Sequence, residues 1–202
     1  SSDVCSSDLL GGLSEVREHL EISDNQSLQD LTGLNGVVSI ANSLRVTNNP
    51  SLRSLSGLEQ VNSSGAVTIL SNAALEDLNG LTGMQTIDGS LTIENNTELQ
   101  SLAGLASLST IGGSLGIVNN VVLNDLTGLD NINSINGNLL IFSNDALTSL
   151  AGLQNLTEVK GNFHLAFSQA LASSNLVKLT YIGGYLQIAV CDKVPDLTGF
   201  TN

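Results

Sequence analysis

The chain has 202 residues, of which 41% are hydrophobic but only 3% aromatic, and it contains no tryptophan. Its core must therefore be built from Leu, Ile and Val. With 6 basic and 19 acidic residues the formal net charge is −13, so the sequence lacks the basic patch that nucleic-acid binding requires. No apolar run approaches the roughly 18 residues of a transmembrane helix, and we expect no direct insertion into a membrane.

A unit of about 24 residues repeats along the chain, and each copy begins with two apolar residues separated by one other residue. The unit reads L-x-I-x-x-N-x-x-L-x-x-L-x-G-L-x-x-L-x-x-I-x-G-x, and successive copies start 23 or 24 residues apart. The alternation at its start predicts a short strand with one buried face. We expect strands to begin, in chain order, at Leu20, Leu44, Val67, Leu91, Leu115, Leu139, Phe163 and Leu186.

After each strand the apolar residues recur every three positions, and two glycines return at fixed places in the unit. Such spacing suits a backbone that turns corners, and repeated glycine indicates either a positive φ or coils that pass too closely for a Cβ. One coil cannot bury its own leucines, whereas a stack of coils shares one continuous core. We therefore predict an all-β fold, a single-chain β-solenoid of about eight coils with a parallel sheet and an aliphatic core.

One column of the repeat holds a small polar residue in every copy. An amide at a corner can donate to and accept from the backbone of its own and the adjacent coil, so we interpret the column as a structural ladder rather than a row of metal or sugar ligands. The thiol at its end is expected to be buried and inert. The column consists of Asn25, Asn49, Asn72, Asn96, Asn120, Asn144, Ser168 and Cys191.

A second polar column alternates between aspartate and serine. Calcium binding is one reading, but the spacing fits neither an EF-hand nor the glycine-aspartate nonapeptide repeat, and capping of a tight turn is favoured. The two histidines, His19 and His164, lie six coils apart, which excludes a histidine metal cluster or a Ser-His-Asp triad. We predict no catalytic residues, no metal site and no cofactor. The column consists of Asp30, Ser54, Asp77, Ser101, Asp125, Ser149, Ser173 and Asp196.

The outward face of the predicted sheet changes along the chain. Early coils place charged and hydroxyl residues there, such as Glu21 and Arg45. Later coils place apolar and aromatic residues, and exposed patches of this kind often mark interaction sites. The alternative is that flanking sequence covers these side chains or that they pack against each other. The candidate partner-binding face consists of Val118, Leu140, Phe142, His164, Ala166 and Phe167.

The segments IDGSLTI (87–93), IGGSLGI (111–117) and INGNLLI (135–141), each followed by N-x-x-L-x-x-L-x-G-L, resemble the receptor L-domain family. The resemblance implies a right-handed β-helix without intrinsic catalysis, located outside the cell or on its surface. The scarcity of cysteine favours the microbial surface-protein type. The expected function is recognition or adhesion, with a protein or glycan bound on an exposed solenoid face. The alternative is a structural stalk or cell-wall spacer with no ligand of its own.

The first nine residues, SSDVCSSDL, do not follow the repeat. Counting back from Leu20, the apolar columns fall correctly on Val16, Leu13 and Leu10, and the register then fails. The segment also resembles the translation of a common sequencing-adapter oligonucleotide. We therefore interpret residues 1–9 as non-native and residues 10–202 as the repeat region, truncated at both ends.

Overall fold

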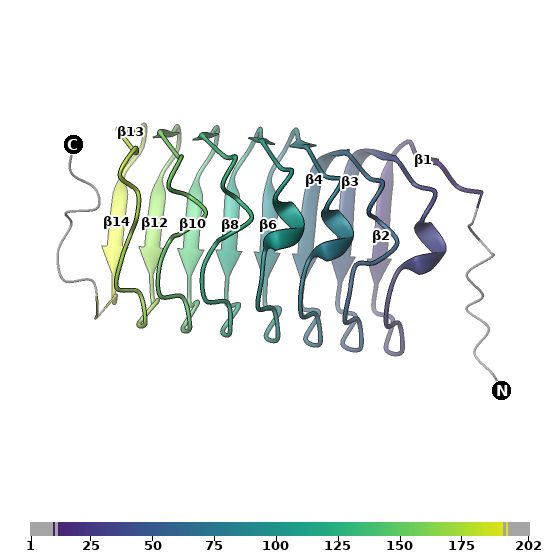
Figure 1. The fold of residues 1–202 in the computed structure, drawn as a ribbon. Helices are drawn as coiled ribbons and strands as arrows, with labels where there is room; N and C mark the ends of the chain where they lie inside the picture. Colours follow the sequence, from purple (N-terminus) through teal and green to yellow (C-terminus); the bar gives the residue numbers. More distant parts are fainter. Residues whose placement is uncertain (1–9, 11, 192, 194–202) are drawn as a thin grey trace.

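The computed structural model describes residue 10, residues 12–191 and residue 193. These residues form a rod of stacked coils with strands running across it, which confirms the predicted β-solenoid (Figure 1). Residues 1–9, which we interpret as non-native, and Asp196 lie outside the described residues.

The longer of two strand ladders contains the L-x-I segments, and every predicted strand is present. Each strand pairs in parallel with its counterpart one repeat away, so that Leu115 lies beside Leu139 and Ile117 beside Ile141. The register therefore equals the sequence repeat. The ladder consists of β2 (His19–Ser23), β3 (Ser39–Thr47), β4 (Ser63–Leu70), β6 (Leu91–Glu94), β8 (Leu115–Val118), β10 (Leu139–Phe142), β12 (Phe163–Ala166) and β14 (Leu186–Ala189).

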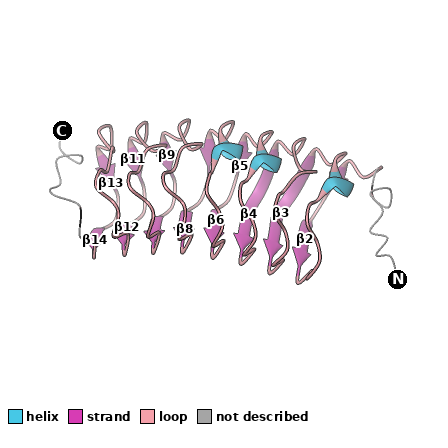
Figure 2. Cartoon of the chain, turned by 60° about the horizontal axis from the view of Figure 1, so that its bottom comes forward, coloured by secondary structure: helices cyan, strands magenta, loops and turns pink. Residues whose placement is uncertain are grey.

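A second ladder of two-residue strands lies one corner earlier in each coil. The long strands β3 and β4 continue through this corner and pair in both ladders, which joins them into one sheet (Figure 2). Three short 3-10 helices lie on the connecting segments: η1 (Thr32–Leu34), η2 (Asn79–Leu81) and η3 (Ala103–Leu105). The two-residue strands are β1 (Glu15–Val16), β5 (Thr86–Ile87), β7 (Thr110–Ile111), β9 (Ser134–Ile135), β11 (Glu158–Val159) and β13 (Tyr181–Ile182).

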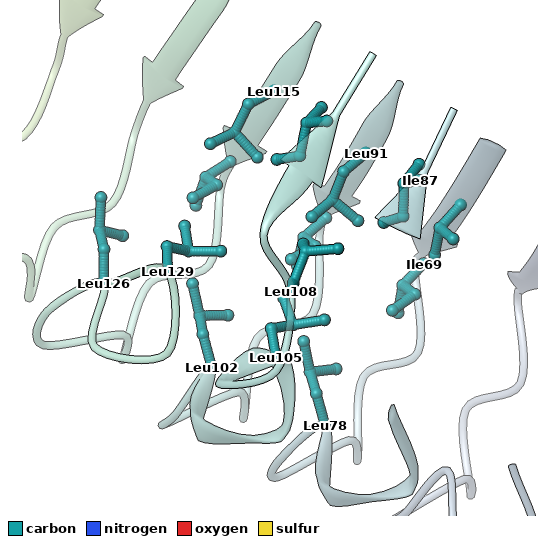
Figure 3. Close-up of a cluster of buried hydrophobic side chains, with 14 of the residues drawn as sticks. Ile69, Leu78, Ile87, Leu91, Leu102, Leu105, Leu108, Leu115, Leu126 and Leu129 are labelled. Atoms are coloured by element: carbon teal, nitrogen blue, oxygen red, sulfur yellow. The ribbon is translucent and has the colours of Figure 1, made fainter. Parts of the chain in front are cut away.

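The core is a set of aliphatic columns that run along the rod. Leu78, Leu102 and Leu126 follow one another at equivalent positions of successive coils, and all three are fully buried (Figure 3). Because each side chain packs on its own counterpart, one coil supplies the apolar surface that its neighbour covers. The predicted aliphatic core is confirmed.

The repeated glycines are explained mainly by close approach of adjacent coils. A Cβ added at Gly104 would overlap the carbonyl oxygen of Leu78 in the coil before it, and one at Gly80 would overlap that of Leu55. Positive φ is the additional reason at only some positions, such as Gly128 with a φ of 115°. Both alternatives that the sequence left open therefore occur.

The side chain two residues after the glycine distinguishes two kinds of corner. At positive-φ Gly57, Gly128 and Gly152, that side chain accepts a hydrogen bond from the glycine N–H. In the 3-10 corners the same place holds Asn35, Thr82 or Ala106. A side chain that reaches back to the glycine N–H gives this backbone donor a hydrogen-bond partner. The acceptors are Glu59, Asp130 and Gln154.

The aspartate and serine column caps turns, as the sequence predicts. Asp77 accepts a hydrogen bond from the backbone N–H of Asn79 at 2.9 Å, and Asp125 accepts one from Thr127 at 2.8 Å. Serine serves equally well, since the Ser101 hydroxyl accepts from the Ala103 N–H. Within the described part of the chain, no group of three His, Cys, Asp or Glu residues could hold a metal ion.

Candidate binding surface

The asparagine column forms the predicted ladder. Each side-chain oxygen accepts the backbone N–H of the asparagine one coil earlier, as between Asn96 and Asn120 at 3.2 Å. From Asn49 to Asn120 the side-chain nitrogen also donates to carbonyls of the preceding coil and of its own, as Asn120 does to Ile93 and Val118. The asparagines from Asn49 to Asn144 are fully buried. Asn25 keeps the bonds to Asn49 but is exposed at the end of the stack.

The last two rungs of this ladder are weaker. Ser168 is fully buried, yet its hydroxyl has no hydrogen-bond partner. Cys191 is half-buried rather than buried, which corrects the prediction, because it lies in the last described coil. Its thiol faces the Ala189 carbonyl at 3.5 Å, the contact that the asparagine nitrogen makes in earlier coils. The asparagines therefore form the predicted structural ladder, and Ser168 and Cys191 occupy its last two positions.

The sequence analysis missed a second polar ladder, which is formed by the residues immediately before β6, β8, β10, β12 and β14. The Ser90 hydroxyl accepts from the Ser114 N–H, Ser114 from Asn138, and the Asn138 oxygen from Asn162. The last rung is the Tyr185 N–H, which donates to the Asn162 oxygen at 3.0 Å. The signal was present as a serine or asparagine before five of the eight L-x-I segments, but His19, Ala66 and Tyr185 interrupt the column.

The candidate face divides into a sheet surface and a corner. Leu140, Phe142 and Val118 are half-buried on the outward side of β8 and β10. Ala166 lies between Phe142 and Ala189 and is only 3% exposed, so it offers no accessible surface to a partner. Phe167 is 50% exposed and lies on the corner after β12, not on the sheet.

Three rings on successive coils contact each other across this surface. The His164 ring lies edge-on to Phe142, with centroids 5.8 Å apart, and 4.5 Å from the Tyr185 ring. The His164 Nε2 is buried without a hydrogen-bond partner. Tyr185, absent from the sequence-based candidates, is 53% exposed. We call Phe142, His164 and Tyr185 the aromatic row.

The corner after each strand of the longer ladder holds a residue in the left-handed conformation. Four coils use Asp or Asn there, the residue types that best tolerate a positive φ, and two coils use Ser. The last two coils instead place Phe167 and Val190 at this corner, with φ of 54° and 53°. We call these two residues the apolar corner. The polar examples are Asp24, Asn48, Ser71, Asn95, Asn119 and Ser143.

Exposed large hydrophobic side chains concentrate at this end of the rod. Among the described residues eight are exposed, and six of them lie between Phe167 and Val190. At the other end, the described residues leave an open hollow of about 470 Å³ lined by Leu20, Ile22 and Leu28. Leu20 and Ile22 belong to the core columns, so this hollow is the open end of the core rather than a separate site.

Comparison of the chain with protein families, curated proteins and solved structures gives no match. Within the part of the chain that the structure describes, no helix has the length and apolar character needed to cross a membrane.

Proposed function

We propose that the chain is a non-enzymatic recognition or adhesion module of the receptor L-domain type. It acts outside the cell or on its surface and binds a protein or glycan on the outward face of its later coils. The observation that carries this proposal is the exposed apolar surface at these coils, where Phe167, Tyr185 and Val190 are each about half exposed. Exposed patches of this kind on a soluble protein commonly mark interaction sites.

Each strand of the longer ladder has two positions that face outward, one within its L-x-I segment and one directly after it. The residue types at these positions support a binding surface on the later coils. From β8 to β14 the outward positions hold no Asp, Glu, Lys or Arg, whereas β2, β3 and β6 present Glu21, Arg45 and Glu94. An interface core is depleted in charged residues and enriched in aromatic ones. The later coils have this composition and the earlier coils do not.

The test is a glycan and surface-protein array probed with the whole chain, followed by Phe142→Ser on any hit. We expect at least one binder and about a tenfold or greater loss of affinity in the variant, the effect of removing an interface anchor. Thr92→Ser, on the outward face of an earlier coil, is the matched control and should bind as the wild type does.

The second candidate is a stiff spacer, favoured by the uninterrupted core columns and by the polar outward face of the early coils. A chain that binds nothing on the array would support the spacer. Binding that Phe142→Ser leaves unchanged, with stability alone reduced, would mean that the row has only a packing role.

A further inference from the structure

The apolar corner costs conformational energy that a polar residue would avoid. A positive φ is rare outside Gly, Asn and Asp, and for a β-branched residue such as Val190 it is a true outlier. Residues held in such regions carry conformational strain and cluster at functional sites. Six preceding coils solve the same corner with Asp, Asn or Ser.

Among the described residues, neither side chain gains the burial that would offset this cost. Phe167 is 50% exposed and Val190 46%, so each leaves much of its apolar surface in water. The backbone hydrogen bond at this corner forms with polar and apolar side chains alike. The Phe167 N–H donates to the Ala189 carbonyl at 3.1 Å, and Ser143 donates equivalently to Ala166 at 3.1 Å.

We infer that Phe167 and Val190 anchor a binding site for a protein partner whose contact surface is apolar at its centre and acidic at its border. This inference rests on the proposed function and names its partner class. The site continues across the small Ala166 to Phe142, the residue paired with it in β10, and from there along the aromatic row.

The polar groups of this surface favour protein over glycan. A glycan is recognised through many hydrogen bonds, but two of the amide oxygens beside the aromatic row are already used within the fold, whereas the Gln187 amide beside His164 is exposed. The Asn162 oxygen accepts from Tyr185, and the Asn138 oxygen accepts from Asn162. What remains accessible is chiefly aromatic and aliphatic, the composition of a protein–protein hot spot.

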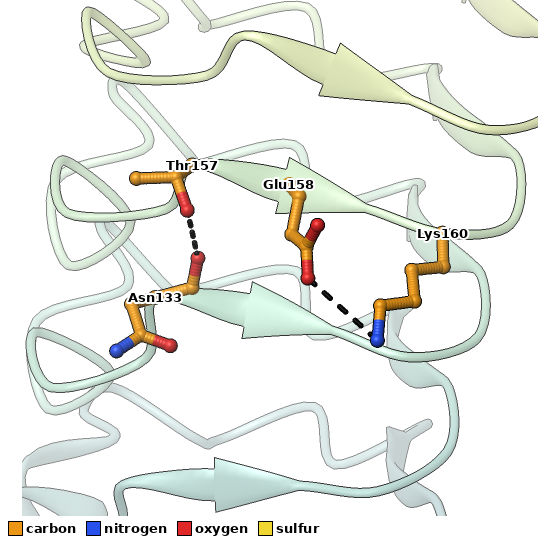
Figure 4. Close-up of polar contacts among 4 residues, drawn as sticks. All are labelled: Asn133, Thr157, Glu158 and Lys160. Carbon is orange, nitrogen blue, oxygen red and sulfur yellow. Dashed lines mark hydrogen bonds and ion pairs between the residues drawn. The ribbon is translucent and has the colours of Figure 1, made fainter.

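The basic residues near this site indicate that the partner's contact surface has an acidic border. The segment from Glu158 to Lys193 holds all three lysines of the chain and two acidic residues, whereas the rest holds three basic and seventeen acidic residues. Lys193 is exposed and follows Val190 of the apolar corner by three residues. Lys160 lies before β12, where its ammonium is 3.7 Å from Glu158 and about half exposed (Figure 4). Complementary charge at a rim steers association and makes it depend on salt.

The inference is tested with synthetic peptides in three matched sets: an apolar centre with Glu flanks, the same centre with Lys flanks, and a Ser-Gly centre with Glu flanks. The variant is Phe167→Asn with Val190→Asn, which restores the polar corner, and Ser143→Asn is the control one coil earlier. We expect the Glu-flanked apolar set to bind about tenfold more tightly than the other two, and more weakly at high salt. The double variant should lose this binding while its Tm stays the same or rises.

The other outcomes separate this inference from the proposed function. Equal binding of the Glu-flanked and Lys-flanked sets, or unchanged binding by the double variant, overturns the inference. Glycan binding that Phe142→Ser removes and the double variant keeps leaves the proposed function intact and refutes the protein partner. A concentration-dependent doubling of mass in light scattering, abolished in the double variant, would replace the external partner with a second copy. No binding to peptides, glycans or proteins refutes both.

Discussion

Glycines of this repeat differ sharply in what a side chain would meet. A Cβ at Gly104 would overlap the Leu78 carbonyl oxygen, which is backbone and cannot move aside. At Gly116, in the outward row of β8, the nearest atom would be the Thr92 hydroxyl oxygen at 4.0 Å. The two positions therefore provide a matched pair of substitutions with opposite expected effects.

Gly104→Ala should destabilise the fold by about 1–3 kcal/mol, because the coils must separate to admit the methyl group. Gly116→Val should instead stabilise it by up to about 1 kcal/mol, since a β-branched residue suits a strand and restricts the unfolded chain. The midpoint of urea unfolding measures both. Equal effects of the two variants would show that close approach of coils does not explain the glycines.

Ser168 offers a gain of stability at a ladder position. Its buried hydroxyl lacks a partner, whereas asparagine at this place in other coils bonds to two carbonyls and to the neighbouring rung. Ser168→Asn should therefore raise the free energy of unfolding by about 1 kcal/mol. Asn120→Ala, the opposite change, should cost about 1–3 kcal/mol for each backbone group left buried and unpaired. Urea unfolding decides, and a lower midpoint for Ser168→Asn would contradict the ladder account.

At the scale of the coil, the repeat period was sufficient to predict the strands of the longer ladder and the asparagine ladder, but not the two-residue strands. Each of these ladders follows from a column in which one residue type recurs, so that every copy reinforces the assignment. The left-handed corner was not predicted, because Asp, Asn and Ser are common in any turn and Phe167 and Val190 contradict local preference. The contact of Phe142 with His164 joins different columns, and no repeat pattern reveals it.

The repeat consensus also could not predict which corners form a 3-10 helix and which contain a glycine with positive φ. The corner type depends on a position that varies between copies, where Glu59, Asp130 and Gln154 accept the glycine N–H and Asn35, Thr82 and Ala106 do not. The candidate site was only partly predictable for a related reason. Tyr185 is exposed because it lies near the end of the described stack, and Ala166 is buried because strands flank it on both sides. Both properties depend on neighbouring coils.

The stability of one of these corners depends on pH through the carboxylate of Asp130. The hydrogen bond from the Gly128 N–H at 2.9 Å, aided by the Gln154 amide at 2.6 Å, lowers the pKa of Asp130 below its ordinary value. A lowered folded pKa means that the charged carboxylate stabilises the fold fully above the unfolded pKa of about 3.9. This contribution is lost as the pH falls through the lower, folded value.

The Tm advantage of the wild type over Asp130→Asn should therefore be constant near neutral pH and shrink below about pH 4. Gln154→Met, which removes one donor, should move the pKa of Asp130 back toward its ordinary value, measured by carboxyl NMR. A Tm difference that stays constant down to strongly acidic pH would contradict the role of the carboxylate.

Along the whole molecule, each coil contacts only its neighbours, as the strand pairing from β2 to β14 shows. Stability of such an array is approximately a sum of coil and interface contributions. The core side chains of the interior coils are fully buried, whereas Leu20 and Ile22 at one end and Leu186 and Ile188 at the other are partly or well exposed. Opening should therefore start at the ends.

Hydrogen exchange should accordingly be slowest in the amides of β6, β8 and β10 and fastest in β2 and β14. Leu105→Ala, in a fully buried column, should cost about 2–5 kcal/mol and raise exchange most in its own coil and the two adjacent coils. A substitution of the exposed Val38 to Ala is the control and should leave interior exchange unchanged. Equal protection from β2 to β14, with Leu105→Ala raising exchange uniformly, would mean that the rod unfolds as one cooperative unit instead of coil by coil.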